Sequence, residues 1–222
     1  MRRLGALLAV LLLAGCGSAA GGEEGTATLW ITRNRGAVLL HEAQVPAGQT
    51  LMRATASVAE VETRYGGRYL QAIDGLAGSL GARRDWFWFV NGYEGDRSAA
   101  EYRLRPGDVA WWDYRAWRRE GEARVVVGAF PEPFLHGYAG RVRDAAVRYE
   151  PTEARKAARL AELVGAESVE PLGAPVPAGA NVLEVRAGRP RRTIELLGET
   201  AGDPVRVVVV GDADPTRRYA VP

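Results

Sequence analysis

The sequence has few of the residue types that build most catalytic and metal sites. Its 222 residues include a single cysteine, Cys16, and two histidines, His41 and His136. One cysteine excludes a disulfide within the chain, and we interpret neither histidine as part of a local catalytic or metal motif. Phosphate-binding loops, Gly-x-Ser-x-Gly turns and His-Glu-x-x-His segments are absent from the sequence. We therefore expect no enzymatic activity, no cofactor and no metal site.

The chain also lacks an excess of either charge. It has 29 basic and 27 acidic residues, and two of the basic residues, Arg2 and Arg3, belong to a segment that we expect to be removed. The remaining basic residues are interspersed with acidic ones. A nucleic-acid-binding surface needs clustered basic residues that neutralise phosphates. We therefore expect no nucleic acid among the partners.

The apolar run from Leu4 to Leu13 is too short to span a bilayer as a helix. It follows two arginines and leads into Leu13-Ala14-Gly15-Cys16, which resembles a bacterial lipoprotein signal. The resemblance implies cleavage before Cys16 and acylation of its thiol, with residues 1–15 as signal peptide and residues 16–25 as lipidated cysteine and flexible tether. We therefore expect an extracytoplasmic protein anchored to the cell membrane. The alternative is an ordinary signal peptide that has a cysteine at this position by chance.

Tryptophan is unevenly distributed along the chain. All six tryptophans fall between Trp30 and Trp117, and the rest of the chain relies on valine, alanine and leucine. This shift predicts two domains, residues 26–118 and residues 121–222. Both are long enough to bury a core of their own.

The first domain is organised around residues 85–92. In this segment the large apolar residues 86–90 lead into Asn91-Gly92. Asn-Gly favours the two positive-φ positions of a tight hairpin turn, so we expect a central strand followed by a turn. Further strands are predicted at Thr26–Arg33, Val38–Val45, Arg68–Ile73 and Val109–Trp117, and a helix from Thr50 to Ala59. This order, β-β-α-β-β-β, predicts an α+β fold of the β-grasp type.

The second domain is predicted to be a small α/β or α+β unit. A helix is expected from Thr152, as its cap, to Gly165, with a stripe of alanines. Residues 130–134 are predicted to form a stiff, proline-rich loop. Strands are predicted at residues 124–129, 142–149, 181–186, 193–197 and 205–210.

Side chains alternate across a strand, so the aromatic strands present two different faces. One face is assigned to the core under the helix: Trp86, Trp88, Val90, Trp112 and Tyr114. The opposite face is assigned to four aromatic rings: Phe87, Phe89, Trp111 and Trp117. These rings are either an interdomain core, covered by the second domain, or an open platform for a flat apolar ligand or a partner.

Several motifs of the first domain together resemble the C-terminal β-grasp domain of transcobalamin and intrinsic factor. They are Ile73-Asp74-Gly75, the segment from Trp86 to Gly92, Tyr102 and Pro106-Gly107-Asp108-Val109. In that family the domain closes over a corrinoid held by a helical-toroid domain, and nothing in this sequence resembles that toroid. The resemblance implies a possible corrinoid ligand, and a membrane transporter or a separate helical-toroid protein as partner.

Together these observations predict a lipid-anchored extracytoplasmic binding protein that presents a corrinoid-like or other flat apolar ligand to an uptake system. The alternative is a cell-surface module that binds a protein or an envelope polymer and no small molecule. A third possibility, an envelope hydrolase, has no catalytic residues to support it.

Overall fold

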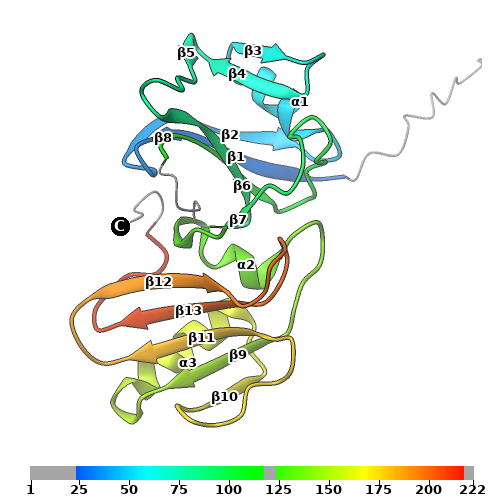
Figure 1. The fold of residues 1–222 in the computed structure, drawn as a ribbon. Coiled ribbons are helices and arrows are strands. Elements are labelled where there is room, and N and C mark those ends of the chain that lie inside the picture. The colour runs from blue at the N-terminus through cyan, green and yellow to red at the C-terminus, as the bar shows by residue number, and fades with distance from the viewer. Residues whose placement is uncertain (1–23, 118–123, 218–222) are drawn as a thin grey trace, which may run out of the picture.

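The computed structural model describes residues 24–117 and 124–217. These residues form a strand-rich α+β structure with two five-stranded sheets and one three-stranded sheet. The first sheet and the small sheet are built from residues 26–116, and the second large sheet from residues 145–210. In Figure 1 the first two sheets occupy the upper half of the molecule and the second large sheet the lower half.

The first sheet is mixed and has the strand order β2-β1-β8-β6-β7. Its central strand, β8, runs parallel to β1, and the other neighbours are antiparallel. The bounds of its strands are β1 Thr26–Arg33, β2 Val38–Pro46, β6 Arg84–Val90, β7 Tyr93–Glu94 and β8 Val109–Ala116. The aromatic strand predicted from the sequence is β6, and it lies beside β8 for its whole length.

One short helix, α1 (Leu51–Ala56), packs against the first sheet. Thr50 caps it as predicted, because its hydroxyl accepts a hydrogen bond from the Arg53 backbone at 3.3 Å. Thr55 of this helix accepts a hydrogen bond from the Trp112 indole at 2.8 Å. The small antiparallel sheet follows the helix and consists of β3 Val61–Arg64, β4 Tyr69–Ile73 and β5 Leu76–Ala77.

The second large sheet has the order β10-β9-β11-β13-β12, with only the edge strand β12 antiparallel. Its strands are β9 Ala145–Tyr149, β10 Ser168–Pro171, β11 Asn181–Arg186, β12 Arg191–Leu196 and β13 Val205–Val210. Helix α3 (Ala154–Val164) packs on this sheet and ends at Gly165, which has a φ of 63°. The helix follows a 3-10 turn, η2 (Pro151–Glu153), so its cap is Glu153 and not the predicted Thr152.

The segment that enters the second half differs from its prediction. Residues 124–129 are expected to form a strand, but residues Val127–Ala129 form a 3-10 helix, η1. Only Val125 pairs as a strand would, in a single bridge to Tyr93. The cause is packing, because Val126 and Ala129 are buried against the first sheet. The predicted loop at residues 130–134 contains the start of a second short helix, α2 (Glu132–Leu135).

Apolar side chains fill three clusters. The largest lies between the first sheet and α1 and includes Trp86, Val90, Trp112 and Tyr114, as the strand alternation predicts. A second cluster lies between α3 and the second large sheet. The third lies on the other face of the first sheet. In the described part of the chain, no helix is both long enough and apolar enough to cross a membrane.

The turn at Gly92 gives a test of how closely the two halves pack. Gly92 has a φ of 88°, and a Cβ there would lie 2.9 Å from the Val126 carbonyl oxygen and 3.2 Å from Pro133 Cγ. Gly67 has the same φ, but a Cβ there would meet nothing within 4 Å. Gly67→Ala should therefore cost only the backbone strain, about 1–2 kcal/mol. Gly92→Ala should cost at least about 1 kcal/mol more, because it also overpacks the junction.

Urea unfolding of both variants and the wild type measures this difference. Equal losses of stability for Gly92→Ala and Gly67→Ala would mean that residues 126–133 do not pack closely against the turn.

Candidate functional site

The predicted ligand or partner face of the first sheet is largely a core. Phe89 and Trp111 are each only 1% exposed, and they share an apolar cluster with Val126, Ala129 and Trp30. The prediction that these two rings form an open platform is therefore wrong. The interdomain-packing interpretation holds for them, because the chain that leads into the second half returns across this face.

The other two rings of that face are only partly buried. Phe87 contacts the Arg115 guanidinium, whose carbon lies 4.9 Å from the ring centroid, and Trp117 lies at the end of the sheet. Arg115 itself is 1% exposed and also lies 4.7 Å from the Phe89 centroid. Through these cation–π contacts, this face of the sheet forms part of the protein interior.

Trp111 provides the test of this assignment. Its indole donates a hydrogen bond to the Thr32 hydroxyl at 2.7 Å inside the cluster. Trp111→Ala should therefore lower the free energy of unfolding by about 3–5 kcal/mol, as buried aromatic truncations do. Tyr65→Ala is the control, since Tyr65 is 79% exposed, and it should change stability by no more than about 0.5 kcal/mol. Equal, small effects in thermal or urea unfolding would restore the open-platform interpretation.

Asn91 and Gly92 occupy the two-residue turn between β6 and β7. Their φ angles are 52° and 88°, and Val90 pairs with Tyr93 across the turn. Asn91 is fully buried, and its side-chain amide donates to the Asp108 carboxylate at 2.7 Å and to the Gly137 carbonyl at 2.8 Å. Asn91 and Gly92 therefore connect the first sheet to the second half of the chain.

The remaining chemical candidates do not form a metal site in the described residues. His41 contacts the Asp74 carboxylate at 2.6 Å, and His136 pairs with Glu132 four residues earlier. Glu132 is a local acidic partner of His136 that the sequence analysis misses. No group of three or more metal-ligating side chains occurs in residues 24–117 and 124–217. Cys16, the predicted lipidation site, lies outside the described residues.

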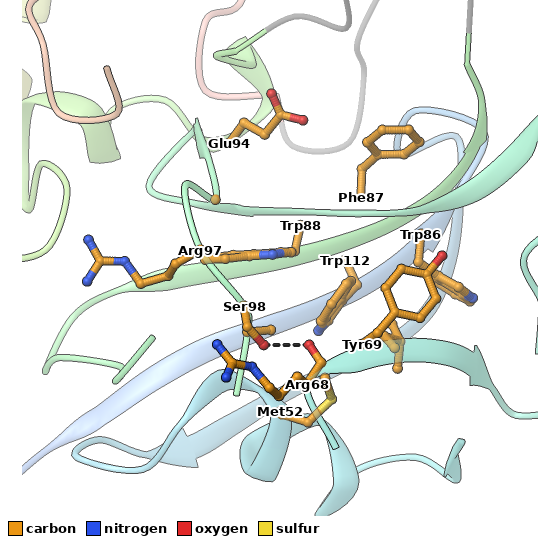
Figure 2. A pocket seen from close by; sticks show the side chains of 13 residues that line it. Met52, Arg68, Tyr69, Trp86, Phe87, Trp88, Glu94, Arg97, Ser98 and Trp112 are labelled. Atoms are coloured by element: carbon orange, nitrogen blue, oxygen red, sulfur yellow. Dashed lines mark hydrogen bonds between the residues drawn. The ribbon is translucent and has the colours of Figure 1, made fainter. Parts of the chain in front are cut away.

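A pocket of about 260 Å³ opens on the helix side of the first sheet. Its walls come from α1, β4, β6, β8 and the loop after β7. Figure 2 shows Trp88 and Trp112 on one side of the β6 backbone, with Phe87 pointing away from them. Five aromatic residues line this pocket: Tyr69, Trp86, Phe87, Trp88 and Trp112.

The three tryptophans differ in what their indole N–H groups bind. Trp86 donates to the Leu76 carbonyl at 2.8 Å, and Trp112 donates to the Thr55 hydroxyl at 2.8 Å. The Trp88 indole N–H has no hydrogen-bond partner among the residues that the structure describes. Its ring instead contacts two aromatic neighbours, edge-to-face with Tyr102 at a centroid distance of 5.5 Å and tilted to Trp112 at 6.4 Å. Among the three tryptophans that line the pocket, Trp88 is therefore the one whose indole N–H is unpaired within the described residues.

Gly95 forms the part of the wall that lies against Trp88. A Cβ at this position would overlap the Trp88 indole, so only glycine lets the loop approach the ring so closely. Ser98, from the same loop, donates to the Arg68 carbonyl at 2.5 Å and ties the loop to the β3–β4 connection (Figure 2). Sequence periodicity does not reveal this loop, since it contains no regular pattern.

Charged and polar side chains at the pocket mouth are already paired with neighbours. Arg97 binds Asp96 through two hydrogen bonds of 2.7 and 3.1 Å, and Arg68 binds Glu101. The Tyr69 hydroxyl donates to Asp85 at 2.8 Å. Partial burial, followed by this hydrogen bond, raises the pKa of Tyr69 to about 12. The phenol therefore remains protonated, and a hydrogen-bond donor, at neutral pH.

Comparisons with known proteins bear on part of the chain. A crystal structure of haptocorrin in complex with Cbi matches 46% of this chain and 29% of its own, with 18% identity and a TM-score of 0.36. The structure of a candidate metal-binding protein from Ruminococcus gnavus matches over 43% of this chain and 100% of its own, with 11% identity and a TM-score of 0.36. Scores of this size establish neither a shared fold nor a shared ligand. No curated protein sequence matches the chain.

Residues 48–116 match a family described as a domain of unknown function (DUF4430). The pocket-lining residues begin at Met52 and end at Trp112. The match to this domain of unknown function therefore takes in every residue that lines the aromatic pocket.

Proposed function

We propose that the protein is a binding protein and that the aromatic pocket is its ligand site. The observation that carries this proposal is the Trp88 indole N–H, a donor without a partner among the described residues, in a pocket that two other tryptophans line. Ligand pockets combine apolar walls with a few polar groups that fix orientation. We propose binding without catalysis, since the polar groups at the mouth are held by their neighbours.

The size of the pocket limits the ligand. At about 260 Å³ it lies just below the usual range for sites that enclose a small molecule, about 300–1,000 Å³. It suits a single flat ring with a hydrogen-bond acceptor at its edge. A corrinoid remains a candidate only if one edge or substituent enters the pocket and the rest is held by another protein. The helical-toroid partner or membrane transporter expected from the sequence would have that role.

The finer assignments of fold and location are part of the same proposal. We propose that the first sheet and α1 form a β-grasp domain, which the central parallel pair β1 and β8 with a helix across one face supports. We also propose that Cys16 carries the lipid anchor and holds the protein on the outer side of the cell membrane. The support for this is the Leu13-Ala14-Gly15-Cys16 pattern.

Two tryptophan variants test the ligand site, with N-acetyltyrosine amide and cyanocobalamin as probes. Trp88→Phe keeps a ring but removes the free indole N–H, so affinity should fall about 3- to 10-fold with little loss of stability. Trp86→Phe is the matched control. It removes an indole N–H that already binds Leu76, so stability should fall while affinity changes less. Calorimetric titration and urea unfolding measure both quantities for each variant.

The outcomes separate the alternatives. Binding of the tyrosine probe with the expected contrast supports the pocket, and an absorbance change of cyanocobalamin that depends on Trp88 supports a corrinoid. If neither probe binds, or if Trp88→Phe leaves binding unchanged, the pocket is not the ligand site.

The anchor has a separate test in cells that express the full chain. Cys16→Ser removes the only thiol in the sequence, so the variant should incorporate no radiolabelled fatty acid and should keep its signal peptide. Membrane fractionation and mass determination give the result. A shortened, lipid-labelled variant would contradict the anchor assignment.

A further inference from the structure

The pocket loop, residues 94–98, borders two cavities. Four of its residues line the aromatic pocket: Glu94, Gly95, Arg97 and Ser98. Residues 94–96 also line a second cavity of about 280 Å³, whose other walls come from the second half of the chain. Because cavities border so much of this short segment, its position depends on hydrogen bonds more than on close packing.

The first half of the chain holds the pocket loop at two points. The Gly95 N–H donates to the Trp88 carbonyl at 3.0 Å, and the Ser98 hydroxyl binds the Arg68 carbonyl. Asp96 and Arg97 lie between these two points. The hydrogen bonds that hold Asp96 and Arg97 therefore decide the shape of this part of the wall.

Those hydrogen bonds come from the second half of the chain. The Tyr138 hydroxyl donates to the Asp96 carboxylate at 2.6 Å and accepts from the Asp96 N–H at 3.2 Å. The Glu94 N–H donates to the Arg124 carbonyl at 2.8 Å, beside the bridge between Tyr93 and Val125 where β7 meets the second half (Figure 1). Burial, followed by the hydrogen bond to Asp96, raises the pKa of Tyr138. The phenol therefore stays protonated and donates to Asp96 at neutral pH.

The ring of Tyr138 also supports the pocket through Tyr102. The two ring centroids lie 5.3 Å apart, and Tyr102 in turn contacts the Trp88 ring at 5.5 Å. The Tyr102 hydroxyl accepts from the Ala139 N–H at 3.2 Å. Tyr138 and Tyr102 are both buried, so neither ring can move without repacking the junction. One side chain of the second half therefore braces the loop directly and Trp88 indirectly.

Asp96 connects Tyr138 to the pocket mouth. Its carboxylate accepts from Tyr138 and, through two hydrogen bonds, from Arg97, which lines the pocket. The Asp96 side chain is 40% exposed. Without the Tyr138 hydroxyl, Asp96 and Arg97 could therefore turn together toward solvent. A ligand would then have to order this wall as it binds, and that ordering cost lowers affinity.

We propose that Tyr138 is a positioning residue for the aromatic pocket, and that the second half of the chain holds the pocket in its binding shape through this side chain. The inference rests on the proposed function of the pocket. It gives the second half a role in binding, although the second half does not line the aromatic pocket. Coupling between two sites is reciprocal, so a bound ligand should also strengthen the junction at Tyr138.

Two phenylalanine variants of the full chain in detergent test this role. The probe is whichever of N-acetyltyrosine amide and cyanocobalamin binds the wild type through Trp88. Tyr138→Phe keeps the ring and removes the hydroxyl, so the Kd measured by calorimetric titration should rise about 3- to 10-fold.

Tyr93→Phe is the matched control. Tyr93 is also buried, and its hydroxyl also donates across the junction, to the Asp203 carbonyl at 3.2 Å, but its side chain does not bind the pocket loop. Both variants should lower the midpoint of urea unfolding. Tyr93→Phe should change the Kd by less than about twofold, because Asp96 and Arg97 keep their partners.

A double-mutant cycle with Asp96→Ala shows whether the Tyr138 hydroxyl acts through the loop. Asp96→Ala removes the acceptor and should weaken binding by itself. In that background, Tyr138→Phe should raise the Kd by less than about 1.5-fold, because the bond is already lost. An undiminished effect would mean that the hydroxyl acts elsewhere, and the inference would be wrong.

Hydrogen exchange followed by NMR gives the reciprocal measurement. The probe should slow exchange of the Asp96 amide proton in the wild type, and Tyr138→Phe should reduce this protection. Equal losses of affinity in Tyr138→Phe and Tyr93→Phe would contradict the positioning role and leave the proposed function intact, since the wild type would still bind through Trp88. If neither probe binds the wild type, the proposed function fails, and this inference fails with it.

Discussion

The packing of the two halves depends on the buried side-chain amide of Asn91. It donates to Asp108 and Gly137, and its oxygen accepts from the Val109 N–H at 2.7 Å. These bonds join the end of β6 to the start of β8 and to the chain beyond α2. A buried amide that loses its partners costs about 1–3 kcal/mol per group. Burial also raises the pKa of Asp108, against the opposing effect of the Arg105 N–H and the Asn91 amide, so this carboxylate depends on the same bonds.

A second buried asparagine makes the same kind of hydrogen bonds in the other half of the chain. Asn181, at the start of β11, is fully buried and donates to the Pro133 carbonyl at 2.9 Å, and its oxygen accepts from Val205 at 3.0 Å. Both asparagines therefore bind the segment around α2, one from each sheet. The sequence identifies Asn91 as a turn residue, but its side-chain partners lie far away in the chain and leave no local pattern.

The prediction from sequence succeeds where alternation decides the outcome. Trp86, Val90, Trp112 and Tyr114 lie under α1 because a strand with apolar residues on both faces needs cover, and α1 covers one face. The prediction of an open platform is wrong for Phe89 on the other face, because alternation does not show which segment covers that face. The valines of the covering segment predict a strand, but the segment forms η1 and packs on the sheet.

The candidate site is less predictable for the same reason. Trp88 is correctly assigned to the helix side, but the pocket beside it exists because the loop at Gly95 and Ser98 closes one wall. No periodic pattern marks that loop.

The close approach of Gly95 to the Trp88 ring has a consequence for how relatives of this protein diverge. This wall of the pocket is backbone without a side chain, and its N–H is already bonded to the Trp88 carbonyl. Any larger residue at position 95 would have to displace the Trp88 indole, which is itself a wall of the pocket. Under the proposed function, ligand preference can therefore vary through the side chains of the other walls, such as Tyr69 and Arg97. Relatives that bind different ligands should differ at those positions and share the glycine.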